Sequence, residues 1–501
     1  MLSGGLLARN VVWNLVGTGL PLVVALFAIP VLIERMGTER FGLLTIVWMG
    51  VGYFSVFDLG LGRALTKLVA ERLGQGREGE LPILIGTALW LMLILGTLAA
   101  LTVLAVTPWL VGRVLNVPES LVGEAVWSFR SLALALPFVI STAGLIGILQ
   151  AHQRFDAINA VRIPLGLMNF LGPLLAVTFT PSLVVTTLVL AGSRAAAFFA
   201  YRKLCRPHVG AGGARATFDR GAVRELLGFG GWITISNVVS PLMVYFDRFL
   251  IGALITMTAV TYYTTPYQVV TRLSIVPDAL VAVLFPALTT ALSAHPGRAN
   301  RIFSTSARIL LLAVAPPVAG VVLFAPEGLS LWLGPEFAEK STLVLRWLAA
   351  GVFINCMARL PFVTLQGAGR PDLTAKLHLG ELPIYVIAIW VLVQAFGIAG
   401  AAAAWTLRIV LDTTALFVLA MQQLPALRNS ALSTLSMTTA TALGLVLLVL
   451  PEDLRLKAAC FLAVSGLCGG LAMREICAIR KHSCPRTLSP TRVQERYRQK
   501  V

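Results

Sequence analysis

Long apolar segments recur along the whole chain, and they constrain its fold more than any other feature. A helix that crosses a lipid bilayer needs about 20 mostly apolar residues. Fourteen segments meet this requirement, and they are 10–33, 41–62, 83–107, 123–151, 160–180, 183–203, 226–252, 258–291, 303–325, 343–366, 377–396, 398–421, 433–450 and 456–476. The longest of them, 258–291, is long enough to contain a kink. We therefore predict an all-α polytopic membrane protein with about 14 transmembrane helices.

The composition supports this class and excludes most others. Of the 501 residues, 57% are hydrophobic and only 13% are charged, whereas soluble domains carry about 25% charged residues. The net charge of +17 would suit a nucleic-acid-binding protein, but so apolar a chain is not a soluble one. We expect no nucleic-acid partner.

The positive charges lie mainly on one side of the predicted spans. With the N-terminus in the cytoplasm, 26 of the 40 Lys and Arg residues fall in cytoplasmic segments, 6 on the opposite side and 8 inside spans. Cytoplasmic loops of membrane proteins carry such an excess of Lys and Arg. The distribution predicts that both termini are cytoplasmic and that Arg63 and Arg162 belong to the cytoplasmic face.

The spans fall into two similar halves. We predict a six-helix N-terminal lobe at 1–204, a cytoplasmic linker at 205–225 and a six-helix C-terminal lobe at 226–422. Because each half has an even number of spans, the halves share one orientation and are related by a pseudo-two-fold axis along the membrane normal. Two additional transmembrane helices (433–476) and a basic cytoplasmic tail (477–501) follow.

The loop at 63–82 is predicted to continue the second span as an amphipathic helix. Its apolar residues Leu65, Leu68, Val69 and Leu73 share one helical face, and Lys67 and Glu71 have the spacing of an ion pair.

Motifs of soluble enzymes are absent from the sequence. It contains no Walker A, G-x-S-x-G or H-E-x-x-H motif, and its five histidines are scattered. We therefore predict that the chain is not an enzyme and holds no metal and no cofactor.

Ionisable residues inside spans are costly, and they mark functional sites by default. The cationic ones are all arginine: Arg130, Arg194, Arg248, Arg272, Arg308, Arg346, Arg359 and Arg408. The acidic ones are Asp58, Asp247, Asp278, Glu381 and Asp412. The positive excess favours an anionic substrate, and the planar fork of arginine suits phosphate and diphosphate.

Structural roles are open for several of these residues. Arg408 and Asp412 are four residues apart and have the spacing of a neutralising pair. Asp58 precedes Gly60 and Gly62. As alternatives to a functional role, Asp58 could cap a helix there or pair with Arg63.

Several motifs resemble those of a known family. They are FDLGLGRAL at 57–65, ILQA at 148–151 with the following Arg154-Phe155, DRFLIG at 247–252, and VP at 276–277 with LFPAL at 284–288. Their order and spacing resemble the Wzx-type polysaccharide flippases, a family of the MATE-like multidrug/oligosaccharidyl-lipid/polysaccharide exporter superfamily. The resemblance covers most of residues 8–421.

This resemblance implies a flippase for O-antigen or exopolysaccharide in the bacterial inner membrane. It implies that an undecaprenyl-diphosphate-linked oligosaccharide crosses the membrane by alternating access, and that polymerase and export machinery are partners. Arginines would hold the diphosphate, and the candidates are Arg272, Arg194, Arg359, Arg408, Arg130 and Arg248. An acidic residue would couple transport to an H+ or Na+ gradient, and the candidates are Asp58, Asp247, Asp278 and Asp412.

Two alternatives stay open. A drug or metabolite cation antiporter of the same fold would need a cavity dominated by carboxylates. A polytopic polysaccharide polymerase or ligase would need a long external loop carrying Arg or His, and the longest external segments here have only about 15 residues.

Overall fold

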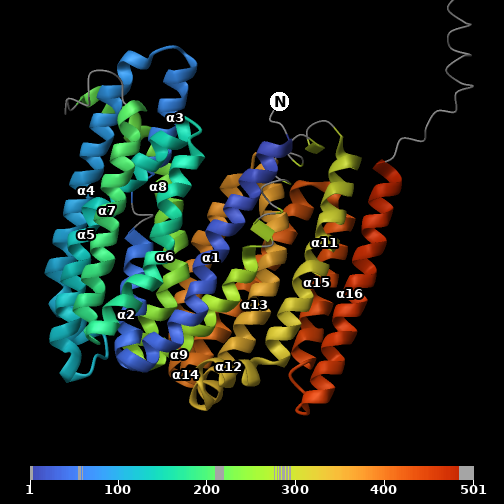
Figure 1. Ribbon diagram of the computed structural model, residues 1–501. Helices are drawn as coiled ribbons and strands as arrows, with labels where there is room; N and C mark the ends of the chain where they lie inside the picture. Colours follow the sequence, from blue (N-terminus) through green and yellow to red (C-terminus); the bar gives the residue numbers. More distant parts are fainter. Residues whose placement is uncertain are drawn as a thin grey trace, which may run out of the picture. The chain divides into compact units, whose positions relative to one another are not determined.

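Helices make up the regular secondary structure of the residues that the computed structural model describes, which are 4–54, 58, 60–208, 219–275, 277–278, 280, 284, 288, 291–292 and 295–483. The α-helices (Figure 1) are α1 (Gly4–Met36), α2 (Thr38–Phe54), α3 (Leu61–Gly74), α4 (Leu81–Trp109), α5 (Glu119–Ala151), α6 (Phe155–Phe179), α7 (Leu183–Cys205), α8 (Arg220–Leu254), α9 (Met257–Val270), α11 (Pro296–Leu323), α12 (Ala325–Leu333), α13 (Pro335–Gly367), α14 (Pro371–Gln423), α15 (Arg428–Leu447) and α16 (Leu454–Ser483). The short helical turns are η1 (Glu78–Glu80), η2 (Leu110–Val114), η3 (Arg206–His208), η4 (Thr271–Ser274) and η5 (Pro425–Leu427).

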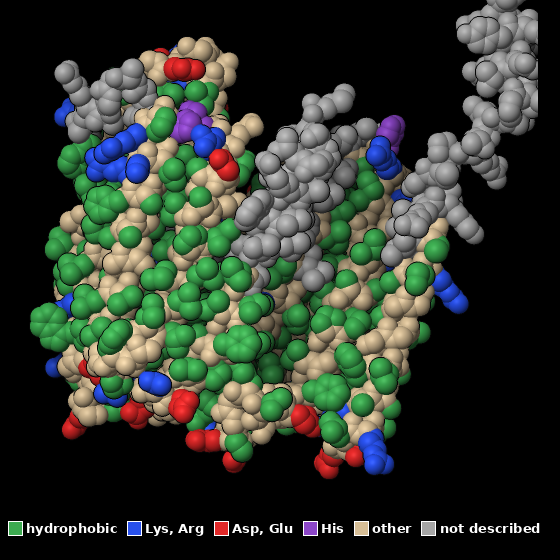
Figure 2. Space-filling model, in the orientation of Figure 1, with side chains coloured by type: hydrophobic (Ala, Val, Ile, Leu, Met, Phe, Trp, Pro, Cys, Tyr) green, Lys and Arg blue, Asp and Glu red, His purple; other side chains and the backbone are tan. Residues whose placement is uncertain are grey.

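The predicted all-α membrane class is confirmed. Within the described ranges, nine helical segments are long and apolar enough to cross a membrane. Hydrophobic side chains cover the middle of the helices that are visible in Figure 2, and charged side chains gather near the helix ends. Large apolar side chains stay exposed on these helices, among them Phe27, Phe179 and Leu462. Exposed apolar surface of this extent belongs in lipid. The number of fourteen spans stays a prediction.

Two helix boundaries show how the chain bends. The predicted span 41–62 is not one continuous helix, because α2 ends at Phe54 and α3 begins at Leu61. The predicted spans 377–396 and 398–421 meet within α14 at Gly397, whose φ of 58° is non-helical. Glycine adopts this left-handed region without steric cost, which explains the bend. The part of the predicted span 258–291 that follows η4 lies mostly outside the described residues.

Asp58 forms the turn into α3. Its Oδ1 accepts a hydrogen bond from the Gly60 N–H at 3.0 Å, and its Oδ2 accepts one from the Gly62 N–H at 2.8 Å. Gly60 has a φ of 72°, and a Cβ on Gly62 would stand only 2.6 Å from Asp58 Oδ2. Both glycines are therefore required by the geometry of the turn. Of the two structural roles considered for Asp58, this geometry supports capping.

The amphipathic helix predicted at 63–82 is α3. Its buried face includes Leu65, Leu68 and Val69, and the predicted pair Lys67–Glu71 has an N–O distance of 3.5 Å. The amphipathic helix is therefore confirmed, but its continuation of the second span is wrong, because α3 begins at Leu61 after the turn at Asp58 and ends at Gly74.

The chain forms two compact units. Unit 1 comprises Met1–Arg272, Leu329–Leu348 and Ala375–Arg408, and unit 2 comprises Leu273–Gly328, Ala349–Thr374 and Ile409–Val501. These units are defined by internal contacts, and the two-lobe division at 205–225 stays a prediction.

Unit 1 is built around α5. Helices α4 and α7 pack along α5, and α3 packs against it (Figure 1). Their shared core includes the fully buried Leu65, Met92 and Ile140. Helices α2 and α9 also pack closely. Their backbones approach so near at Gly42 that a Cβ there would collide with the backbone carbonyl of Met257. Only glycine permits such an approach between two helix backbones.

Unit 2 is built around α11, which packs against α15 and α16. Its core includes Phe303, Val363 and Phe417. Lys457 at the start of α16 is buried and bonds to Glu327 of α12 at 2.5 Å. This ion pair fixes one end of α16 to the neighbouring segment.

Candidate functional site

Three neighbouring cavities lie among the helices of unit 1. The first, which we call the α6 cavity, has a volume of about 360 Å³. The second, the Asp58 cavity, has a volume of about 420 Å³. The third, the Trp48 cavity, has a volume of about 490 Å³. Arg194 lines all three, so they meet at this side chain.

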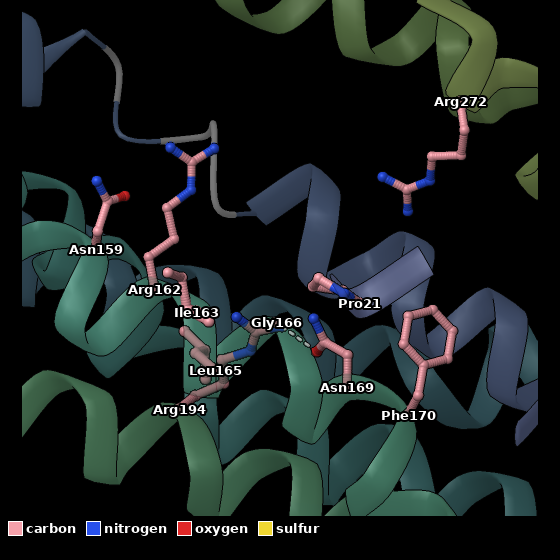
Figure 3. A pocket seen from close by; sticks show the side chains of 10 residues that line it. All are labelled: Pro21, Asn159, Arg162, Ile163, Leu165, Gly166, Asn169, Phe170, Arg194 and Arg272. Atoms are coloured by element: carbon pink, nitrogen blue, oxygen red, sulfur yellow. Dashed lines mark hydrogen bonds between the residues drawn. The ribbon is translucent and has the colours of Figure 1, made fainter. Parts of the chain in front are cut away.

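The α6 cavity gathers three arginines (Figure 3). Arg162 comes from α6, Arg194 from α7 and Arg272 from η4, and all three side chains line the same space. Arg194 Nη2 donates a hydrogen bond to Asn169 Oδ1 at 2.6 Å, drawn as a dashed line. The buried Nε of Arg194 has no hydrogen-bond partner among the described residues. A buried donor without a partner is a position where a ligand acceptor can bind.

One face of α6 supplies most of this lining. Asn159, Arg162, Gly166, Asn169 and Phe170 all contribute to the α6 cavity. Steps of three and four residues bring side chains to the same side of a helix, and this spacing explains their common direction.

The charge of the three cavities is strongly positive. Their ionisable lining groups other than tyrosine are five arginines and one carboxylate, namely Arg63, Arg162, Arg194, Arg248, Arg272 and Asp58. Both oxygens of Asp58 already accept backbone hydrogen bonds. Arginine forks in a space shielded from bulk water bind phosphate groups through short, charge-assisted hydrogen bonds. Such a lining can bind an anion.

Three of the predicted substrate-binding residues lie together. Arg194 and Arg272 line both the α6 cavity and the Trp48 cavity, and Arg248 lines the Trp48 cavity. The guanidinium of Arg248 stacks over the ring of Tyr267, with its Cζ 4.1 Å from the ring centroid.

The other three predicted arginines do not line these cavities. In unit 2, Arg359 Nη2 lies 3.6 Å from Asp278 Oδ1, and both side chains are partly exposed. In unit 1, Arg408 Nε lies 3.7 Å from Glu381 Oε2, and its guanidinium lies over the Tyr385 ring.

Arg130 lies over the exposed Trp127, with its Cζ 5.2 Å from the ring centroid. Roles in substrate binding for Arg359, Arg408 and Arg130 stay predictions.

Two of the predicted coupling residues are buried without lining these cavities. Asp247 is fully buried in α8; its Oδ2 accepts a hydrogen bond from the Tyr263 hydroxyl at 2.6 Å, and its Oδ1 accepts one from the Arg248 N–H at 2.7 Å. Asp412 is buried in α14 within unit 2. Its predicted pairing with Arg408 stays a prediction.

Arg162 and Arg63 extend the site beyond the predicted residues. The positive-inside pattern assigned both to the cytoplasmic face, yet Arg162 lines two of the cavities and Arg63 lines one. The signal in the sequence is the spacing of Asn159, Arg162, Gly166 and Asn169, which marks a polar face on an otherwise apolar helix.

Metal ligation finds no support in the described part of the chain. Those residues contain no group of three or more His, Cys, Asp or Glu side chains placed to hold an ion.

The fold is that of a polytopic, MATE-like membrane protein. The chain covers 99% of a solved structure of the lipid II flippase MurJ in an inward closed conformation, with a TM-score of 0.71, 14% identity and 93% of this chain aligned. It covers 95% of an inward-facing multidrug resistance MATE family transporter of the MOP superfamily, with a TM-score of 0.67, 16% identity and 83% of this chain aligned.

Sequence comparison identifies the family. The family model described as "Polysaccharide biosynthesis protein" matches residues 7–292, which is more than half of the chain. A protein of Shigella flexneri named "Putative O-antigen transporter" is 27% identical over 407 residues, which cover 81% of this chain and 95% of that protein. The chain belongs to the polysaccharide biosynthesis protein family, and the predicted family resemblance is confirmed.

Proposed function

We propose that the chain is a flippase for a polysaccharide precursor. It moves an undecaprenyl-diphosphate-linked oligosaccharide from the cytoplasmic to the periplasmic leaflet of the bacterial inner membrane, for export as O-antigen or exopolysaccharide. The observation that carries this proposal is the α6 cavity, in which Arg162, Arg194 and Arg272 surround one space. Family membership and the similarity to an O-antigen transporter support the same function.

The substrate chemistry fits the cavity. A diphosphate carries the negative charge and the acceptor oxygens that arginine forks bind. The undecaprenyl chain is apolar and stays in lipid, so only the diphosphate and the sugars need a polar route. In this mechanism the arginines hold the diphosphate while the two predicted lobes alternate between openings towards the cytoplasm and the periplasm.

Several finer features belong to the same proposal. The protein is not an enzyme, both termini are cytoplasmic, and polymerase and export machinery consume the flipped product. Transport is driven by an H+ or Na+ gradient. Asp58 and Asp247 are the weaker of the four predicted coupling residues, because both oxygens of each already accept hydrogen bonds within the protein. Asp278 and Asp412 stay the stronger candidates for this role.

The alternatives receive less support from the site. A cation antiporter of the same fold would need carboxylates in its cavity, whereas five arginines face one aspartate here. A polymerase or ligase is disfavoured by the similarity to a protein named as an O-antigen transporter.

Deletion of the gene tests the proposed function. We expect lipid extracts of the mutant to contain single repeat units on the undecaprenyl carrier, with the sugars facing the cytoplasm. Expression of the wild-type chain should restore surface polysaccharide. If carrier-linked units reach the periplasm in the mutant and only fail to polymerise, the chain is not the flippase and the polymerase alternative holds.

A further inference from the structure

Unit 2 contains a smaller cavity of its own, which we call the α11–α15 cavity. It lies between α11 and α15, has a volume of about 160 Å³, and shares no lining residue with the three cavities of unit 1. Its polar lining residues are Ser304, Arg308, Asn429, Ser430, Ser433 and Thr434, and no carboxylate lines it. Arg308 is one of the eight arginines predicted to lie inside spans, and the proposed diphosphate site does not use it.

The polar residues lie on one face of each helix. Ser304 and Arg308 are four residues apart on α11, and Ser430, Ser433 and Thr434 have the same helical spacing on α15. Polar side chains on neighbouring membrane helices often hydrogen-bond across the interface. The described residues show no such side-chain bond between α11 and α15. The Thr434 hydroxyl, for example, donates to the Ser430 carbonyl of its own helix at 2.7 Å. The two polar faces therefore surround a space instead of joining the helices.

Arg308 retains free hydrogen-bond donors beside this space. Its Nη1 donates to Glu475 Oε1 of α16 at 2.6 Å, and 52% of its side chain is exposed. This is the one hydrogen bond that Arg308 makes within the described part of the chain, whereas a guanidinium has five N–H donors. The adjacent Ile309 on α11 and Leu432 on α15 are exposed apolar residues, which places Arg308 beside lipid.

The predicted topology places this arginine at the cytoplasmic surface of the bilayer. Arg308 lies near the start of the span 303–325, and Glu475 lies near the end of the span 456–476, and both of these span ends are predicted to be cytoplasmic. More exposed arginines occur near the same span ends, namely Arg301, Arg428 and Arg474. Basic pockets between membrane helices at this level bind the headgroups of anionic lipids.

We infer that the α11–α15 cavity binds the phosphate group of an anionic phospholipid from the cytoplasmic leaflet. A phosphate accepts hydrogen bonds at each of its oxygens, and Arg308, Asn429 and Ser433 supply donors from two helices. The cavity is smaller than the about 300–1,000 Å³ of small-molecule sites, so it admits a phosphate group and excludes an oligosaccharide. The acyl chains extend into lipid along Ile309 and Leu432. The bound lipid thus links α15 to α11, independently of the flippase site.

Lipid binding to the purified full-length chain in detergent tests this inference. The probes are dioleoyl phosphatidylglycerol, which is anionic, and dioleoyl phosphatidylcholine, which carries a phosphate but no net charge. Native mass spectrometry during a lipid titration measures the affinity for the first bound lipid. The wild-type chain should prefer phosphatidylglycerol. Arg308→Gln should weaken its binding about tenfold, the effect of one charged hydrogen bond, and Ser433→Ala should weaken it about fivefold.

Two further variants separate lipid binding from a structural role of the Arg308–Glu475 pair. Glu475→Gln removes the carboxylate that competes with phosphate for Arg308, so binding of phosphatidylglycerol should become stronger. A merely structural pair would give the opposite result, because both Arg308→Gln and Glu475→Gln would loosen α16 and neither would strengthen lipid binding. Arg455→Gln makes the same charge change at an exposed arginine near the other end of α16 and should leave the affinity unchanged.

Three results would overturn the phospholipid site. They are an Arg308→Gln affinity for phosphatidylglycerol equal to that of the wild type, an equal loss in Arg455→Gln, and weaker binding in Glu475→Gln. Competition identifies the source of the phosphate. Neither inorganic phosphate nor undecaprenyl phosphate should displace phosphatidylglycerol at equal concentration, and displacement by either would assign the cavity to a free anion or to the substrate carrier instead. None of these results bears on the flippase proposal, because the cavities share no residue.

Discussion

Replacement of Arg194 by alanine is expected to reduce polysaccharide export about 100-fold while the protein still inserts into the membrane. Arg194 lines all three cavities of unit 1, and its Nε is buried without a partner among the described residues. Loss of one charged partner from a desolvated site costs about 2–5 kcal/mol, and every 1.4 kcal/mol is about tenfold in binding. Surface polysaccharide per unit of membrane-inserted protein measures the effect.

Two further variants define the cause of this loss. Arg194→Lys keeps the charge without the planar fork, so export should fall to an intermediate level. Arg370→Ala removes an exposed arginine that pairs with Asp372 at 3.1 Å, and exposed pairs contribute at most about 1 kcal/mol. Export should therefore stay normal in this variant. Normal export by Arg194→Ala at wild-type protein level would remove Arg194 from the substrate site.

Replacement of Asp247 by alanine is expected to destabilise the protein by about 3–5 kcal/mol, the cost of breaking a buried charged arrangement. Asp247 is fully buried, accepts the Tyr263 hydroxyl hydrogen bond, and interacts electrostatically with Arg248 and Arg408. Without its carboxylate, the Tyr263 hydroxyl loses its acceptor and the buried Arg248 loses a neighbouring negative charge. The thermal unfolding midpoint of the detergent-purified protein should fall markedly.

Asp278→Ala is the matched control for this prediction. Asp278 also faces an arginine, Arg359, but at 3.6 Å and with 59% of its side chain exposed. Its removal should change stability by less than about 1 kcal/mol. Asp247→Asn keeps an acceptor for the Tyr263 hydroxyl, so its thermal unfolding midpoint should lie between those of Asp247→Ala and Asp278→Ala. An unfolding midpoint of Asp247→Ala equal to that of the wild type would show that this buried network contributes no stability.

The sequence alone predicts those parts of the fold that depend on local patterns. Apolar segments of about 20 residues predict the helices, because a bilayer requires that length. The boundary between 377–396 and 398–421 coincides with the bend at Gly397, and the amphipathic spacing predicts α3. Hydropathy does not reveal the turn at Asp58 between α2 and α3, because the apolar stretch runs through it; only the spacing of Asp58, Gly60 and Gly62 indicates the capping that the hydrogen bonds show.

The site depends on contacts between distant segments, which hydropathy does not reveal. Arg194 and Arg272 are conspicuous as charges inside spans, but nothing in their spacing shows that they share one cavity while Arg359 faces Asp278. The positive-inside pattern predicts a cytoplasmic position for Arg162, because this residue lies near a span end. Only the packing of α6 against α7, with Asn169 bonded to Arg194, brings it into the site.

Transbilayer movement of the lipid-linked repeat unit in vesicles tests the flippase account most directly. The purified chain is reconstituted with this lipid into liposomes, with and without H+ or Na+ gradients, and a membrane-impermeant glycosidase is added outside. Nearly all of the repeat units should become accessible with the wild-type chain, whereas about half, those of the outer leaflet, should be cleaved with Arg194→Ala or without protein. Cleavage that stops at half with the wild-type chain under every gradient would contradict the account.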